Sequence, residues 1–235
     1  MRLDKALTNL GLTRSQAKKA VRDGRARVGD AVVRDPGADV AIENVMLDGQ
    51  TVGVVGDVHL MLHKPAGYIT ATEDGRQRTV MELLPDEYRR LALGPIGRLD
   101  RDVTGLLLLT TDGQLAHRLI SPKRNVEKVY EAEIEGKMTE VEADLIRAGI
   151  SFKDFNAKPA RVEILAPSRI RLTLTEGKYH EVKRICQKVG HPVLRLKRLS
   201  IGGVVLDPTL SEGECRTLTG GEIVHLYAIA GMEDE

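Results

Sequence analysis

Aromatic side chains are scarce in this sequence: it contains no tryptophan, and aromatic residues make up only 3% of the chain. Aliphatic side chains must therefore build the hydrophobic core. With 42% apolar residues in 235, the chain can form one large domain or a small domain beside a medium-sized one. Cysteine is scarce too. Cys186 and Cys215 lack CxxC spacing, so the sequence predicts neither a disulfide framework nor a zinc cluster, and we expect free thiols.

Long apolar runs are also missing. No stretch approaches the roughly 20 apolar residues that span a membrane, and no signal-peptide apolar region follows the first residues. We therefore expect a soluble, cytoplasmic protein with no membrane partner. The formal net charge is only +1, but the distribution of charge along the chain is uneven, and that distribution indicates the kind of partner.

The first 27 residues are locally basic, with eight cations against two acidic residues. Apolar residues at helical spacing predict a short helix up to Gly11. Thr13 and Gln16 then fit the capping box of a second helix, and residues 27–33 predict two short strands around a Gly-Asp turn. Cations on the second helix and at the turn into the hairpin suit a phosphate backbone, although a solvated helix face would carry the same charges.

This region resembles the RNA-binding module named after the small-subunit ribosomal protein S4. The resemblance rests on residues 1–5, 15–19, 24–28 and 33–37. It implies that residues 1–57 form an RNA-binding domain. The cations that would then bind RNA are Arg2, Arg14, Lys18, Lys19, Arg22, Arg25 and Arg27.

Beyond residues 49–56, a glycine- and valine-rich segment that we interpret as a linker or a last strand, the pattern changes. Short alternating apolar segments predict many strands with few helices between them. This favours a mixed, largely antiparallel sheet over a doubly wound parallel one. We therefore predict an α+β protein, with a small domain of helices and a β-hairpin at 1–57 and a larger domain at 58–235.

One loop concentrates side chains that could do chemistry. Arg98, Asp100 and Asp102 lie between Gly97 and Gly105, immediately before four consecutive leucines. Four leucines in a row need burial on both faces of a strand, which would anchor the loop rigidly. Aspartyl phosphatases of the haloacid dehalogenase type carry an Asp-x-Asp-x-Thr motif, but there the apolar strand precedes the motif, whereas here it follows. That order disfavours the phosphatase interpretation.

The loop resembles the catalytic loop of pseudouridine synthases, in which Gly-Arg-Leu-Asp leads into Thr-Gly and a hydrophobic strand. Two further motifs of that family follow in order: Lys128-Val129-Tyr130, and a glycine-bounded turn into a basic helix at 176–184. Many relatives carry Arg where Lys183 stands. The branch that acts on small-subunit ribosomal RNA, the RsuA family, looks similar to this sequence with the lysine included. The resemblance covers nearly the whole chain.

The resemblance implies an isomerase that converts one uridine of 16S ribosomal RNA, free or in a small-subunit assembly intermediate, to pseudouridine, without a metal or a cofactor. Asp100 rather than Asp102 would be the catalytic carboxylate, acting on C1′ as a nucleophile or removing a sugar proton. Lys183 would favour its ionised form. Tyr130 would stack near the base and assist removal of the C5 proton, and Arg98 would help to open the RNA.

Further cations near the third motif would contact RNA. They are Lys178 and Arg184 in the motif itself, and a second patch formed by Lys188, Arg195, Lys197 and Arg198, although any one of these could instead be solvated surface. A general base at His180 is disfavoured against a capping or solvent-facing role, because the reaction does not require it.

Two alternatives stay open from the sequence. The same activity could act on a 23S ribosomal RNA uridine, or the protein could be an RNA-binding ribosome assembly factor with a silent enzymatic domain. The Gly-Lys-Tyr-His corner at 177–180 favours the small-subunit branch, and the intact Asp100, Tyr130 and Lys183 argue against a silent domain. We expect the protein to act as a monomer.

Overall fold

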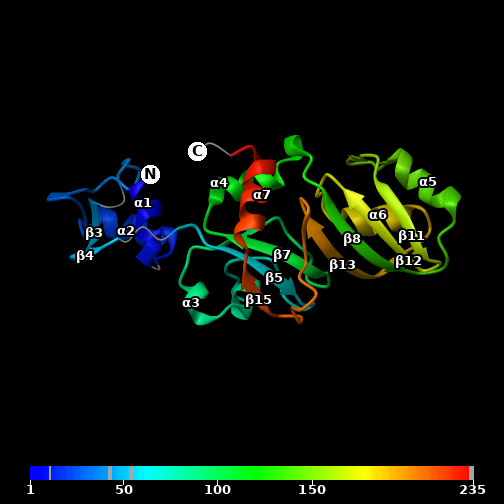
Figure 1. Ribbon diagram of the computed structural model, residues 1–235, viewed down its shortest axis with the longest axis horizontal. Helices are drawn as coiled ribbons and strands as arrows, with labels where there is room; N and C mark the ends of the chain where they lie inside the picture. The colour runs from blue at the N-terminus through cyan, green and yellow to red at the C-terminus, as the bar shows by residue number, and fades with distance from the viewer. Residues whose placement is uncertain (11, 42–43, 53–55, 233–235) are drawn as a thin grey trace. The chain divides into compact units, whose positions relative to one another are not determined.

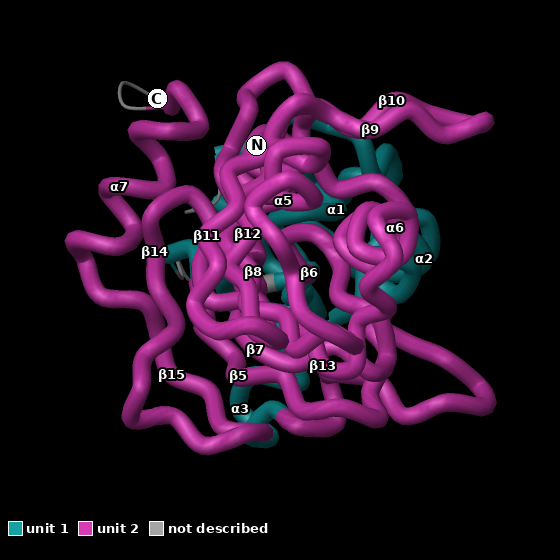
Figure 2. The backbone as a smooth tube through the Cα atoms, turned by 90° about the vertical axis from the view of Figure 1, so that its right-hand side faces the viewer, with its two compact units in different colours: residues 1–58, 84–94 teal, residues 59–83, 95–235 magenta. Residues whose placement is uncertain are grey.

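The computed structural model describes residues 1–10, 12–41, 44–52 and 56–232. The chain divides into two compact units: unit 1 contains residues 1–58 and 84–94, and unit 2 contains residues 59–83 and 95–235 (Figure 2). The predicted boundary after residue 57 lies beside the point where the chain passes from one unit to the other. Residues 84–94, which the prediction assigns to the larger domain, group with unit 1. The predicted linker at 49–56 falls partly on residues 53–55, outside the described residues.

Unit 1 packs short helices against a small sheet. Helix α1 (Leu3–Ala6) runs into a 3₁₀ turn, and α2 (Arg14–Arg22) begins at the predicted capping box, where the Thr13 hydroxyl accepts from the Gln16 amide and the Gln16 side chain accepts from the Thr13 amide. The sheet has the order β2-β1-β3-β4. Its strands are β1 (Ala26–Val28), β2 (Ala31–Val32), β3 (Val45–Leu47) and β4 (Gln50–Thr51). A short helix, α3 (Asp86–Arg89), also belongs to this unit.

Unit 2 is built on a nine-stranded sheet whose main path is β11-β12-β8-β13-β7-β5-β15, as Figure 1 shows. The path strands are β5 (His59–Lys64), β7 (Thr104–Thr110), β8 (Lys128–Ile134), β11 (Arg161–Ala166), β12 (Arg169–Leu174), β13 (Val193–Ile201) and β15 (Cys215–Thr217). Two short strands lie off the path: β14 (Val204–Val205) pairs with β13, and β6 (Gly94–Ile96) pairs with β7. Along the path, β13 and β7 are parallel and the other pairs are antiparallel. The predicted mixed, largely antiparallel α+β fold is therefore confirmed.

Four helices accompany this sheet. They are α4 (Gly113–Ile120), α5 (Glu140–Ala148), α6 (Glu181–Lys188) and α7 (Gly220–Ala230). Helices α4 and α7 lie side by side, α6 contacts β13, and α5 contacts β11 (Figure 1). The four leucines of β7, residues 106–109, are all fully buried, as their run predicts. A short hairpin of β9 (Ile150–Ser151) and β10 (Asn156–Ala157) follows α5. In the described part of the chain, no helix has the length and apolar character needed to cross a bilayer.

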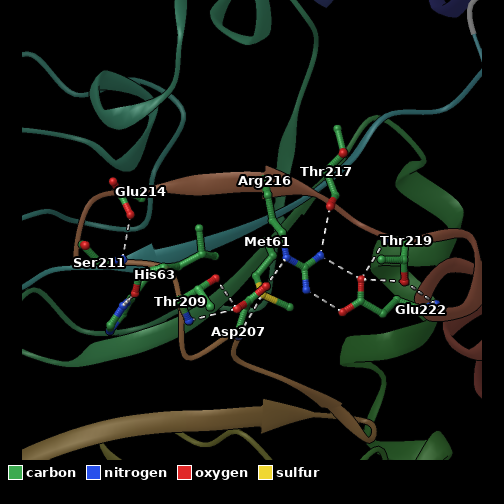
Figure 3. Close-up of polar contacts among 11 residues, drawn as sticks. Met61, His63, Asp207, Thr209, Ser211, Glu214, Arg216, Thr217, Thr219 and Glu222 are labelled. Carbon is green, nitrogen blue, oxygen red and sulfur yellow. Dashed lines mark hydrogen bonds and ion pairs between the residues drawn. The ribbon is translucent and has the colours of Figure 1, made fainter.

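The C-terminal helix is tied to the sheet edge by Arg216 of β15 (Figure 3). Its guanidinium lies 2.7 Å from the Asp207 carboxylate and forms two 2.9 Å hydrogen bonds to Glu222 in the first turn of α7. Hydrogen bonds from Arg216 hold the pKa of the Glu222 carboxyl at about 2, and those from Thr209 and Arg216 hold that of Asp207 at about 2. Glu222 also accepts from the Thr219 amide, so one carboxylate both caps α7 and anchors it.

Candidate active site

The loop at residues 97–105 is held in place by hydrogen bonds to its backbone groups. The Thr70 hydroxyl donates to the Leu99 carbonyl at 2.8 Å and accepts from the Leu99 amide at 3.1 Å. The Val103 amide donates to the Asp100 carbonyl at 3.2 Å, which closes a turn. Asp100 therefore projects from a turn whose neighbours on both sides, Leu99 and Val103, are buried.

Two buried cations hold the loop and the start of β7 by their backbone carbonyl groups. The Lys64 ammonium donates to Val103 at 2.8 Å and to Arg101 at 3.4 Å, and the Arg198 guanidinium donates to Leu106 at 2.8 Å and to Arg98 at 3.4 Å. Burial lowers the pKa of Lys64 to about 8, and the carboxylates of the loop oppose that shift. Arg198 is only 1% exposed, so its assignment to a surface RNA-binding patch is wrong.

Lys183 of α6 bridges the two carboxylates of the loop. Its Nζ lies 2.9 Å from Asp100 Oδ2, 2.8 Å from Asp102 Oδ1 and 3.0 Å from Asp102 Oδ2. Burial alone would lower the pKa of Lys183, but the hydrogen bonds to both carboxylates raise it. Burial by itself would raise the pKa of the Asp102 carboxyl. The hydrogen bond from Lys183 outweighs this effect, and the pKa of Asp102 is lowered. Lys183 is therefore a stable cation at the site.

The residues predicted to be catalytic meet around one small cavity of about 80 Å³. Asp100 comes from the loop, Tyr130 from β8 and Lys183 from α6, and the predicted RNA contacts Arg98 and Lys178 line the same cavity. The Asp100 side chain is 31% exposed, whereas that of Asp102 is 74% exposed and lines a neighbouring hollow instead. The two carboxylates are thus distinguished by position, while the roles of these side chains stay predictions.

His180, for which the sequence favoured a capping or solvent-facing role over that of a general base, is the N-cap residue of α6, has a side chain that is 37% exposed and also lines the cavity. Its backbone has a positive φ of 52° at the start of α6, and its side chain forms no capping hydrogen bond. Instead, Nε2 lies 3.5 Å from Asp100 Oδ2, and the imidazole stacks on the ring of Tyr179. The position of His180 inside the third motif was the available signal. Sequence alone could not show which way its ring turns.

Arg184, which the resemblance assigns to RNA, is engaged elsewhere. It forms two hydrogen bonds to Asp154, of 2.9 and 2.6 Å. Its guanidinium also lies over the rings of Phe152 and Phe155, at 4.7 and 4.6 Å from their centroids. Arg184 does not line the cavity and instead ties α6 to the hairpin of β9 and β10.

The predicted RNA-binding cations of unit 1 are all exposed: Arg2, Arg14, Lys18, Lys19, Arg22, Arg25 and Arg27. Some of them are partly neutralised. Arg2 pairs with the buried carboxylate of Asp4 at 3.1 Å, and Arg25 pairs with Asp48. Within the described residues, Arg27 forms no ion pair but donates to the Asp30 carbonyl, whereas Lys18, Lys19 and Arg22 on α2 form neither an ion pair nor a side-chain hydrogen bond and are the cations most available to an external phosphate.

No group of three or more histidine, cysteine, aspartate or glutamate side chains is arranged to hold a metal ion within the ranges that the structure describes. The candidate site consists of a paired carboxylate, a cation, a phenol and an imidazole.

Comparison with known proteins places both units in families. Residues 58–188 match the RNA pseudouridylate synthase family, and residues 1–46 match the S4 domain. The chain is 43% identical to an uncharacterized RNA pseudouridine synthase of Bacillus subtilis, over 95% of this chain and 97% of the relative. It is 40% identical to ribosomal small subunit pseudouridine synthase A of Escherichia coli, over 95% of this chain and 98% of that relative.

A solved structure agrees with the sequence matches. A pseudouridylate synthase crystal structure superposes with a TM-score of 0.70 at 37% identity, covering 96% of this chain and 99% of that one. Likeness of this extent involves the loop, the strand and the helix that surround the cavity, because it includes nearly every residue of both proteins. The chain is therefore a member of the RNA pseudouridylate synthase family, an isomerase of the RsuA type with an N-terminal S4 domain.

Proposed function

We propose that this enzyme converts one uridine of 16S ribosomal RNA to pseudouridine, with Asp100 as the catalytic carboxylate. The observation that carries the proposal is the 2.9 Å contact between Asp100 and Lys183 in the cavity that Tyr130 also lines. The choice of RNA is supported by the likeness to a relative whose name states a small-subunit ribosomal substrate.

The reaction needs a carboxylate in its charged form. The C1′–N1 bond of the uridine breaks, a C1′–C5 bond forms, C5 loses its proton, and N1 gains one. Asp100 serves either by bonding covalently to C1′ until C5 attacks, or by removing a sugar proton and returning it. Both routes use the carboxylate of Asp100, which the Lys183 ammonium contacts at 2.9 Å.

The two oxygens of the Asp100 carboxylate have different surroundings. Lys183 and His180 both approach Oδ2, at 2.9 and 3.5 Å. Within the described residues no hydrogen bond is formed to Oδ1, so this oxygen is the one available to the ribose. Lys183 thus orients the carboxylate while it stabilises its charge, and such preorganisation lowers the barrier without rearrangement during the reaction.

Tyr130 and Arg98 complete the proposed site. Tyr130 is 8% exposed on β8, where its ring forms part of the cavity wall against which a uracil would stack while its C5 proton is removed. Arg98 is exposed at the start of the loop. A base within an RNA helix must be flipped out to reach the cavity, and an exposed guanidinium at the rim would replace part of its lost pairing.

The proposal is tested with transcripts of 16S and 23S ribosomal RNA labelled with tritium at uridine C5. We expect tritium release from the 16S transcript, up to one equivalent, and none from the 23S transcript. Release from the 23S transcript alone would support the large-subunit alternative. Binding without release from either RNA, including small-subunit assembly intermediates, would indicate an assembly factor with a silent enzymatic domain.

Unit 1 is proposed to bind the RNA through α2. Replacing Lys18, Lys19 and Arg22 together by glutamine should weaken RNA binding and flatten its dependence on salt, since each lost phosphate contact removes about 0.7 to 0.9 from the slope of log K against log salt. Binding isotherms at several salt concentrations measure both quantities. Lys137→Gln, which removes an exposed cation of unit 2, serves as the control. An unchanged slope in the triple variant would remove α2 from the interface.

A further inference from the structure

Tyr179 is the one tyrosine or phenylalanine ring that the chain leaves in solvent. All five tyrosines and both phenylalanines lie in described residues, and Tyr179 is 76% exposed while the other six rings are buried or half-buried. A ring that served packing alone would be covered, because burying an aromatic side chain contributes strongly to folding. An exposed ring is free to contact a partner outside the protein, and the position of Tyr179 beside the site is what makes such a contact relevant.

The position of this ring is fixed by its neighbour. The ring of Tyr179 stacks on that of His180, with centroids 3.8 Å apart and planes 20° from parallel. His180 has a positive φ of 52°, an uncommon conformation that turns the chain sharply before α6. The stacked pair lies at the corner that precedes α6.

One member of this pair, His180, lies at the proposed catalytic cavity. His180 lines that cavity, and its Nε2 lies 3.5 Å from Asp100 Oδ2. The imidazole of His180 therefore lies between the exposed ring of Tyr179 and the proposed catalytic carboxylate. A uridine flipped into the cavity leaves its neighbouring nucleotides at this rim, because they stay joined to it through the backbone.

We propose that Tyr179 and His180 form a stacking platform for a base of the substrate RNA that flanks the target uridine. RNA-binding proteins bind unpaired bases by stacking them on aromatic side chains. The exposed cations Arg98 and Lys178 line the adjoining cavity, where the phosphates on either side of such a base would lie. This inference rests on the proposed function, because it presumes that the target uridine binds beside Asp100.

The platform predicts a direct spectroscopic signal. The chain contains no tryptophan, so Tyr179→Trp creates a single reporter at the platform. We expect its fluorescence to be quenched when the full-length protein binds a 16S ribosomal RNA fragment, since stacking on a base quenches an indole. Val224→Trp places a reporter at a similarly exposed position, 70% exposed on α7, and its fluorescence should change little.

Steady-state kinetics provide a second, independent test of the platform. Tyr179→Ala should raise KM and the RNA Kd about 5- to 150-fold, the range of alanine substitutions at base-stacking positions. Its kcat at saturating RNA should change less than about twofold, because stacking is equal in the ground and transition states. Tyr179→Phe, which keeps the ring, should restore the affinity. An unquenched Tyr179→Trp variant together with an unchanged KM in Tyr179→Ala would overturn the platform.

The two proposals fail in different ways. Suppose that wild-type protein releases tritium from ribosomal RNA, but the Tyr179→Trp fluorescence is not quenched and the KM of Tyr179→Ala is unchanged. In that case only the platform is wrong. If wild-type protein releases no tritium while RNA quenches the Tyr179→Trp reporter, the base-stacking surface stands and the proposed substrate is wrong.

Discussion

Replacing Asp100 by asparagine will abolish tritium release from C5-labelled ribosomal RNA, by a factor of at least about 10³, the scale of losing the central group of a catalytic set. An asparagine side chain fills the same space, but its amide can neither form the ester to C1′ nor accept a sugar proton. RNA binding should persist, because the surface cations are untouched and the Asp100 side chain is only 31% exposed.

Asp102→Asn is the matched control, because it makes the same chemical change two residues away. We expect it to keep measurable turnover. The Asp102 side chain is 74% exposed and lies outside the cavity that contains Asp100 and Tyr130. Its loss leaves Lys183 paired with Asp100 alone. If Asp102→Asn eliminated release while Asp100→Asn retained it, the catalytic carboxylate would be Asp102.

Replacing Gly105 by alanine will destabilise unit 2 more than other single methyl additions. Gly105 pairs with Arg198 where β7 runs parallel to β13. A β-carbon there would lie 2.2 Å from the Arg198 carbonyl oxygen and 2.6 Å from its nitrogen. Both are backbone atoms, so the two strands must separate to relieve the clash. The φ of 106° adds strain of its own for any residue with a β-carbon.

The expected loss at Gly105 is about 4 kcal/mol or more, at the upper end for single substitutions. For a chain of this size, that corresponds to a fall in Tm of about 10 °C. Thermal unfolding followed by circular dichroism measures it. Gly113→Ala is the control: it lies at the start of α4, its added carbon meets no atom within 4 Å, and its φ is not positive. A Gly105→Ala variant with the wild-type Tm would show that β7 and β13 accommodate a β-carbon at this position without a loss of stability.

Features that depend on neighbours in the sequence were predictable. The capping box at Thr13 and the hairpin after Gly24 follow from local hydrogen bonds and turn chemistry, and both are present in unit 1. The buried strand at 106–109 follows from its composition. Short elements at the sheet edge were not foreseen. β15 has three residues and is held by Arg216 through partners in α7 and at Asp207, so no local pattern marks it.

The same distinction applies at the site. The three motifs and their order could be read from the sequence, because each is a run of neighbouring residues. What surrounds each side chain could not. Arg198 and Arg184 look alike as cations near the third motif, yet Arg198 is buried against the loop at 97–105 and Arg184 pairs with Asp154. Whether such a side chain is buried or ion-paired depends on the order of the strands in the sheet, and the positions of charged residues along the sequence do not reveal that order.

By itself, the sequence indicated the family, the fold class and the loop that carries Asp100 and Asp102. The tertiary structure decided which carboxylate faces the cavity, that His180 lies against Asp100, and that Tyr179 is left exposed beside it. The physical reason is distance along the chain. Lys183 and Asp100 are 83 residues apart, and their 2.9 Å contact exists because β13 lies between β8 and β7 and contacts α6.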